Sequence, residues 1–166
     1  MAIEKVREYL KAKGYENKIQ EFEVSSATVE LAAKALNTEG KRIAKTLSFD
    51  VSGRPVLIVA AGDAKVSNSK FKQEFQTKAK MFAFEEVEEK IGHAVGGVCP
   101  FAVNENVEVY LDESLKRFET VFPACGSSNS AIELSILELE ELSNFIKWID
   151  VCVVPEEVWF KILKQN

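Results

Sequence analysis

Short apolar runs alternate with amphipathic segments along the whole chain, and each kind of segment predicts a different element. Apolar residues recur at helical spacing in several stretches bounded by capping residues or glycine. These stretches predict helices at residues 3–13, 29–36, 67–75 and 85–91, and one that begins at Pro155. Runs of apolar and β-branched residues at strand length predict strands at residues 20–24, 43–49, 56–61, 80–84, 107–111, 120–125, 131–134 and 148–153.

The strands at residues 43–49 and 56–61 are predicted to be central and to form a hairpin, because the turn between them contains Gly53 and Pro55. Strands and helices interleave along the chain, which indicates an α+β or α/β fold with a mixed sheet. No repeat, low-complexity tract or linker divides the sequence. Residues 1–166 are therefore expected to form a single domain.

Composition excludes several classes of protein. Of the 166 residues, 46% are apolar and 28% charged, which is typical of a globular domain with its own core. No apolar run approaches the length of a membrane-spanning helix, and the N-terminus lacks a secretory signal, so a cytoplasmic protein without membrane contact is expected. With three scattered cysteines and one histidine, neither a disulfide framework nor a metal site is predicted, and no cofactor is expected.

Charge is distributed unevenly around a net value of −5. Residues 41–80 carry nine basic and three acidic side chains, a net charge of +6, in an otherwise acidic chain. This basic island is compatible with a patch that faces a nucleic-acid phosphate locally, and equally with a solvated surface of no special function. Extended binding along DNA is not expected.

Three segments carry candidate chemistry. Lys45 interrupts an apolar strand pattern, where its ammonium could face a cleft or merely protect a sheet edge. Gly96 and Gly97, followed by Pro100, permit a tight loop whose amides could converge on an anion or an ester oxygen. The segment 126–130, Gly-Ser-Ser-Asn-Ser, places hydroxyl and amide groups at a sheet end, although such a turn often satisfies only its own backbone.

Taken together and in this order, these segments resemble the YbaK/ProX family of aminoacyl-tRNA editing domains, over roughly residues 20–155. The resemblance rests on the lysine of the K-T-L strand, the V-L-I-V-A-A-G-D strand, the loop from Gly96 to Pro100, and the glycine turn before I-E-L. It implies a partly open mixed β-barrel with surrounding helices, like the prolyl-tRNA synthetase-associated domain in its free-standing form. It also implies hydrolysis of the ester in a mischarged aminoacyl-tRNA.

The resemblance further implies roles for individual residues and partners. Lys45 and Gly96 are expected to be catalytic. Expected substrate-binding residues are Thr46, Gly97, Val98, Cys99, Pro100, Gly126, Ser127, Ser128, Asn129 and Ser130. The expected substrate is the acceptor end of tRNA-Pro carrying a small amino acid such as alanine or cysteine, and a synthetase is a possible partner. Thr46 stands where alanine-specific members of the family carry asparagine.

Three alternatives remain open from the sequence. The attacking group is either a water molecule or, for a cysteine substrate, the thiol of the substrate itself. The same fold could serve as a non-catalytic module that binds an RNA end or nucleotide, or docks onto a synthetase. Finally, Cys99 and His93 could form a cysteine hydrolase, with the imidazole activating the thiol.

Overall fold

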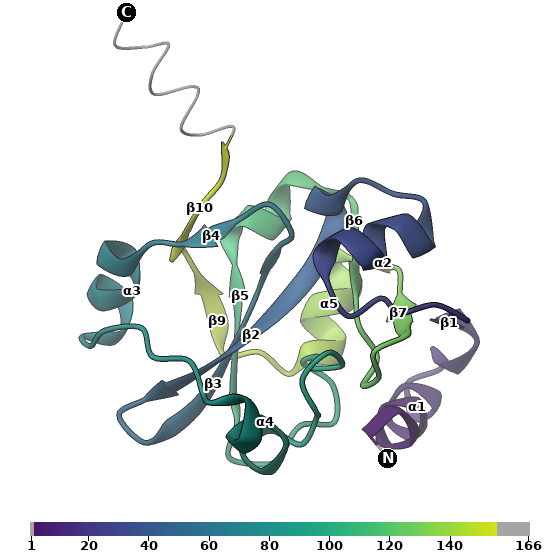
Figure 1. Cartoon of the computed structure of the whole chain (residues 1–166), viewed down its shortest axis with the longest axis horizontal. Helices are drawn as coiled ribbons and strands as arrows, with labels where there is room; N and C mark the ends of the chain where they lie inside the picture. The colour runs from purple at the N-terminus through teal and green to yellow at the C-terminus, as the bar shows by residue number, and fades with distance from the viewer. Residues whose placement is uncertain (1, 156–166) are drawn as a thin grey trace, which may run out of the picture.

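A strongly twisted, mixed six-stranded sheet forms the centre of the computed structural model, which describes residues 2–155 (Figure 1). Its strand order is β8-β6-β2-β3-β5-β9. In that order the strands are Leu134–Ser135, Thr120–Pro123, Ile43–Val51, Arg54–Ala61, Glu108–Asp112 and Lys147–Ile149. The β2–β3 and β6–β8 pairs are antiparallel, whereas β2–β6, β3–β5 and β5–β9 are parallel. This mixed pairing confirms the predicted α+β class.

The central hairpin follows from the local sequence. Ser52 and Gly53 connect β2 to β3 with φ values of 52° and 88°, the left-handed pair that a two-residue hairpin turn requires. The Gly53 amide donates to Asp50 Oδ1 at 2.9 Å, which closes the turn. Every residue of β3 after Arg54 is buried, so this strand forms the middle of the core. The predicted hairpin is therefore confirmed.

Two small antiparallel ladders tie distant segments to the sheet. Strand β1 (Ile19–Glu21) pairs with β7 (Ser130–Ile132), and β4 (Lys65–Val66) pairs with β10 (Cys152–Val153). The first ladder brings the segment before α2 beside the polar turn that precedes β7. The second brings the chain after β9 beside the turn that follows β3.

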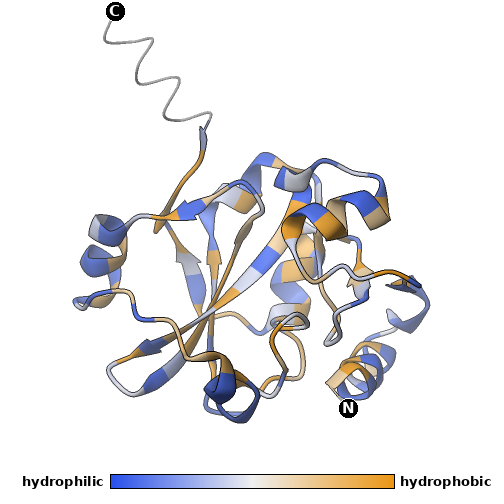
Figure 2. Ribbon diagram, in the orientation of Figure 1, coloured by the Kyte–Doolittle hydropathy of each residue, from blue (hydrophilic) through white to orange (hydrophobic). Residues whose placement is uncertain are grey.

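Helices surround the sheet (Figure 1). They are α1 (Ala2–Ala12), α2 (Val29–Leu36), α3 (Asn68–Phe75), α4 (Phe84–Ile91) and α5 (Ile136–Ser143). Three further segments are 3-10 helices: η1 (Glu16–Lys18), η2 (Gly40–Arg42) and η3 (Glu113–Arg117). Thr28 caps α2 and Ser67 caps α3 through their side-chain oxygens. Figure 2 shows that α3, at the periphery, is largely hydrophilic.

Several sequence predictions need correction. Residues 80–84 are not a strand: Met81 forms one isolated bridge with Phe49, and α4 already begins at Phe84. The predicted strand at 148–153 is two short strands, β9 and β10, on different partners. Helix α5 was not predicted, although Ser135 and Glu138 form a capping box at its start. The helix predicted from Pro155 lies beyond the described residues.

None of the helices in the described part of the chain combines the length and apolar character that crossing a bilayer would need.

Candidate functional site

A cavity of about 480 Å³ opens between the start of α2, the first half of β2, the segment 81–84 and the loop around Gly96. The ends of β6 and β7 complete its wall. Because β2 contributes consecutive residues from Ile43 to Ser48, the cavity lies against the centre of the sheet rather than at its periphery. Apart from Lys45, the lining side chains are apolar or carry a hydroxyl. The cavity therefore has a single cationic group and, among the described residues, no carboxylate.

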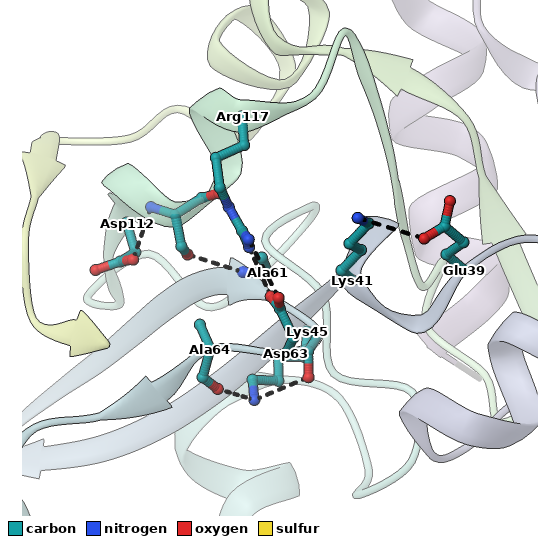
Figure 3. A network of polar contacts seen from close by, with 10 residues as sticks. Glu39, Lys41, Lys45, Ala61, Asp63, Ala64, Asp112 and Arg117 are labelled. Atoms are coloured by element: carbon teal, nitrogen blue, oxygen red, sulfur yellow. Dashed lines mark hydrogen bonds and ion pairs between the residues drawn. The ribbon is translucent and has the colours of Figure 1, made fainter. Parts of the chain in front are cut away.

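Lys45 is half-buried on β2, and its ammonium is held by the turn that follows β3 (Figure 3). Nζ donates to the carbonyl oxygen of Ala64 and, at 3.4 Å, to that of Gly62. Burial lowers the pKa of Lys45, because a low-dielectric environment disfavours the charged amine. Two neutral carbonyls thus hold a cation that also lines the cavity.

The loop around Gly96 reaches the cavity because glycine permits two features of its backbone. Gly96 has a φ of 98°, which side-chain-bearing residues rarely adopt. Gly97 lies so close to the next turn that a Cβ there would be 2.6 Å from the Ser127 nitrogen. The Gly97 amide donates to the Ala94 carbonyl at 3.1 Å, whereas the amides of Gly96 and Val98 make no hydrogen bond within residues 2–155. Gly96 and Val98 both line the cavity and can offer donors to a ligand.

Most polar groups of the turn at residues 126–130 form hydrogen bonds within the turn or with the segment before α2. Ser127 Oγ hydrogen-bonds to Asn129 Oδ1 at 2.9 Å and to Ser130 Oγ at 2.8 Å. Asn129 Nδ2 donates to the Phe22 carbonyl at 2.8 Å, and the Ser128 carbonyl accepts from the Ser26 amide at 2.6 Å. The turn therefore anchors the segment before α2. Of its residues, only Ser130 lines the cavity.

Thr46 adds an unusual polar group beside Lys45. Its Oγ1 is buried and has no hydrogen-bond partner in the described part of the chain. A buried hydroxyl without a partner carries a desolvation cost of about 1–3 kcal/mol, which a bound ligand could offset. Thr46 also lines the cavity, but its Oγ1 has no exposed surface, so a substrate atom would reach this hydroxyl only after neighbouring groups move.

The structure brings together part of the predicted site. Lys45, Thr46, Gly96, Val98 and Ser130 line one cavity. The other predicted residues lie outside the lining: Gly97, Cys99, Pro100, Gly126, Ser127, Ser128 and Asn129. Gly97 and Gly126 act at the contact between loop and turn, and Gly126 packs against α1 with a φ of 93°. Cys99 and Pro100 are buried, and Pro100 lines a second cavity near Tyr9 and Ser143.

The apolar rim of the cavity, formed by Phe84, Met81 and Val95, was not predicted from the sequence. These side chains are 72%, 55% and 46% exposed, respectively, and all three line the cavity. Exposed large apolar side chains gathered at one opening are typical of a binding surface. No sequence signal marked them, because their exposure depends on how the segment 81–84 passes along β2 and on where the loop around Gly96 lies.

The cysteine-hydrolase alternative does not fit the geometry. Cys99 is fully buried, which raises the pKa of its thiol to about 12. His93 Nε2 lies 2.7 Å from the Phe101 carbonyl, so it must donate there and cannot also accept the thiol proton. Burial lowers the pKa of His93, which keeps the imidazole neutral. The pair is therefore structural.

Cys99 is accordingly expected to resist alkylation. Iodoacetamide at pH 8 should leave Cys99 unmodified in the folded protein, because a buried thiol with this pKa has almost no thiolate. Peptide mass spectrometry measures the modification, with urea-unfolded protein as the positive control. Catalytic activity that falls in step with Cys99 modification would contradict this assignment.

Ion pairs engage five of the nine basic side chains of residues 41–80, among them Arg54 with Glu108. Lys41 pairs with Glu39, Arg42 with Glu133, Lys70 with Asp150 and Lys80 with Asp50. The island is therefore less cationic at the surface than its sequence suggests, and Lys45 is its one member that lines the cavity.

Comparison with known proteins relates the chain to aminoacyl-tRNA editing domains. Residues 23–142 match the model of the aminoacyl-tRNA editing domain family. The uncharacterized protein YwhH of Bacillus subtilis (strain 168) is 55% identical over 153 residues, which cover 92% of this chain and 98% of that protein. A proline–tRNA ligase of Lysinibacillus sphaericus (strain C3-41) is 29% identical over 90 residues, which cover 54% of this chain and only 16% of the ligase.

A solved structure agrees over nearly the whole chain. It is the crystal structure of a proposed trans-editing enzyme for prolyl-tRNA synthetase, with a TM-score of 0.80 and 27% identity, and the match covers 90% of this chain and 96% of that one. This agreement confirms the partly open mixed barrel that the sequence resemblance implied.

Proposed function

Because the chain belongs to the aminoacyl-tRNA editing domain family, we propose that it hydrolyses the ester of a mischarged aminoacyl-tRNA, with the acyl group bound in the cavity beside Lys45. The observation that carries this proposal is that Lys45, Gly96 and Val98 line one cavity, with the backbone amides of Gly96 and Val98 making no hydrogen bond within residues 2–155. The proposed place of action is the cytoplasm, where tRNA is charged.

The chemistry needs little beyond positioning. Water attacks the ester carbonyl carbon, an oxyanion develops, and the bond to the ribose oxygen breaks, so that the ribose hydroxyl and the free amino acid are released. The Lys45 ammonium and the loop amides can donate to the oxyanion. No carboxylate or imidazole lines the cavity among the described residues, so no side chain is assigned as a general base.

The lining favours a neutral amino acid side chain over a charged one. Apolar and hydroxyl side chains surround the cavity, and its described lining contains no carboxylate that could pair with a cationic side chain. Alanine, serine and cysteine fit this environment, and tRNA-Pro is the proposed acceptor in view of the related proline–tRNA ligase. A hydrophobic pocket discriminates only weakly between such side chains, by about 10- to 200-fold per methylene or hydroxyl.

The apolar rim is proposed to hold the terminal nucleobase. Phe84→Ala is expected to raise KM about fivefold with little change in kcat, because base–aromatic stacking contributes about 1–3 kcal/mol and Phe84 is partly solvated. Steady-state deacylation measures this effect. Phe84→Tyr is the matched control and should behave like the wild-type protein. Equal KM values for Phe84→Ala and wild type would exclude stacking at this position.

A deacylation panel tests the proposed function. Purified protein is incubated with alanyl-, cysteinyl-, seryl- and prolyl-tRNA-Pro, and the remaining ester is followed over time. We expect cleavage of at least one of the small mischarged substrates and protection of prolyl-tRNA-Pro. Saturable binding of all four substrates without cleavage would instead support the non-catalytic module.

A further inference from the structure

The turn after β3, residues Gly62, Asp63 and Ala64, holds the Lys45 ammonium and is itself fixed from several sides. Gly62 packs so tightly against the Gly40 backbone that no Cβ would fit there. The Ala64 amide donates to the Ala61 carbonyl at 3.0 Å, and the Ala61 amide donates to Ser114 Oγ at 3.1 Å. The two carbonyls that accept from Lys45 therefore have well-defined positions.

Asp63 sits between these two carbonyls in the chain, yet its carboxylate is engaged elsewhere. Both terminal nitrogens of Arg117, on η3, bind this carboxylate: Nη2 lies 2.6 Å from Oδ1, and Nη1 lies 3.1 Å from Oδ2. These two hydrogen bonds form the Asp63–Arg117 fork. Arg117 Nε donates to the Ser114 carbonyl at 2.9 Å, which orients the guanidinium. Only 23% of the Arg117 side chain and 22% of the Asp63 side chain are exposed, so water screens this fork weakly.

The fork keeps the Asp63 carboxylate away from the Lys45 ammonium, although the two groups carry opposite charges. In Figure 3 the Asp63 carboxylate points toward Arg117, while the Lys45 amine lies against backbone carbonyls. A carboxylate is a stronger acceptor for an ammonium than a neutral carbonyl, because the hydrogen bond is charge-assisted. The titratable or charged groups that act on Lys45 are Cys152, Asp63, Lys65 and Glu30, and Asp63 is the one whose neighbours in the chain contact its Nζ.

We infer that Arg117 is a positioning residue. It binds the Asp63 carboxylate and so leaves the Lys45 ammonium hydrogen-bonded to neutral carbonyl oxygens, which a substrate oxygen in the cavity can replace. This inference rests on the proposed function, in which Lys45 donates to the ester. With Asp63 occupied, an ester oxygen competes only with two carbonyls for the ammonium. With Asp63 released, the ammonium would pair with the carboxylate and be withdrawn from the substrate.

The test compares Arg117→Ala, Asp63→Asn and the double variant. Arg117→Ala is expected to lower kcat/KM at least tenfold, because Asp63 then captures Lys45. Asp63→Asn removes the competing charge and should stay within about threefold of wild type. The double variant should recover to within about threefold of Asp63→Asn, although it also lacks the fork. If the fork served only to hold the fold together, the double variant would be no more active than Arg117→Ala.

A second readout does not depend on activity. The pKa of Lys45, followed by NMR of its side-chain nitrogen, should rise in Arg117→Ala and return toward the wild-type value in the double variant. The alkaline limb of the kcat/KM profile should move to higher pH in Arg117→Ala in the same way. If Arg117→Ala keeps full activity, or the double variant is folded but not rescued, the inference is overturned. If wild type lacks deacylase activity while the Lys45 pKa responds as stated, the proposed function fails and the Arg117–Asp63 relationship stands.

Discussion

Replacing Lys45 by alanine is expected to slow deacylation about 100-fold, mainly through kcat. Removal of one preorganised oxyanion donor typically costs about 2.7–4 kcal/mol of transition-state stabilisation. Lys45 should fall at the lower end, because the loop amides of Gly96 and Val98 would remain. Single-turnover deacylation of the best substrate from the panel measures this loss. A Lys45→Ala rate above one third of the wild-type rate would remove the lysine from the chemistry.

Lys65→Ala provides the matched control for this substitution. Lys65 is an exposed lysine close enough to influence the pKa of Lys45, but it does not line the cavity. Its removal should change the rate less than twofold. A comparable loss in both variants would indicate a general dependence on positive charge rather than a specific role for Lys45.

The charge on Lys45 also predicts a pH dependence. Because burial lowers its pKa, enzyme-catalysed deacylation should fall as the pH rises through a value below that of an ordinary lysine, after subtraction of spontaneous ester hydrolysis. The contribution of Lys45 to the free energy of unfolding changes with pH in the opposite direction to the activity. Between the lowered and the ordinary pKa the unfolded state binds more protons, so this contribution rises with pH. An activity loss without unfolding, absent in Lys45→Ala, is the expected result.

Gly97→Ala is expected to reduce both stability and activity, because the added methyl group meets the backbone of the Gly126 turn rather than a movable side chain. The Cβ would lie 2.6 Å from the Ser127 nitrogen and 2.7 Å from the Gly126 carbonyl carbon. Overpacking of this kind costs about 1–3 kcal/mol, or roughly 2–12 °C in Tm for a domain of this size. Since Gly96 and Val98 flank the displaced residue, deacylation should fall at least tenfold.

Gly14→Asn is a suitable control for the loss of a glycine. Gly14 has a φ of 84°, but no atom lies within 4 Å of the point that a Cβ would occupy, and asparagine tolerates this backbone region. Its Tm should change by at most a few degrees and its activity should not change. Wild-type Tm and activity in Gly97→Ala would mean that the loop does not rest on the turn.

Local signals were sufficient to predict much of the fold. The Gly53 hairpin, the cap of Thr28 on α2 and the cap of Ser67 on α3 all depend on residues a few positions apart. The predicted strand at 80–84 failed because an apolar segment can run along a sheet edge and pair through one bridge only. Its composition does not distinguish these two cases.

The candidate site was predictable where one residue conflicted with its surroundings. Lys45 stood out as a charge in an apolar strand, and Gly96 as part of a paired glycine loop. Which loop residues reach the cavity was not predictable, because the contact between Gly97 and the Gly126 turn joins segments far apart in the sequence. The Asp63–Arg117 fork spans 54 positions and leaves no local pattern at either residue.

The acyl end of a charged tRNA is proposed to bind between Lys45 and the Gly96 loop. A non-hydrolysable alanyl-adenosine analogue, titrated into isotope-labelled protein and followed by NMR, tests it most directly. We expect saturable shifts of the Gly96 and Val98 amides and of the Lys45 side-chain nitrogen, with small changes near Tyr9 and Ser143 at the second cavity. Saturable binding that shifts the second cavity and leaves Gly96, Val98 and Lys45 unchanged would exclude this binding mode.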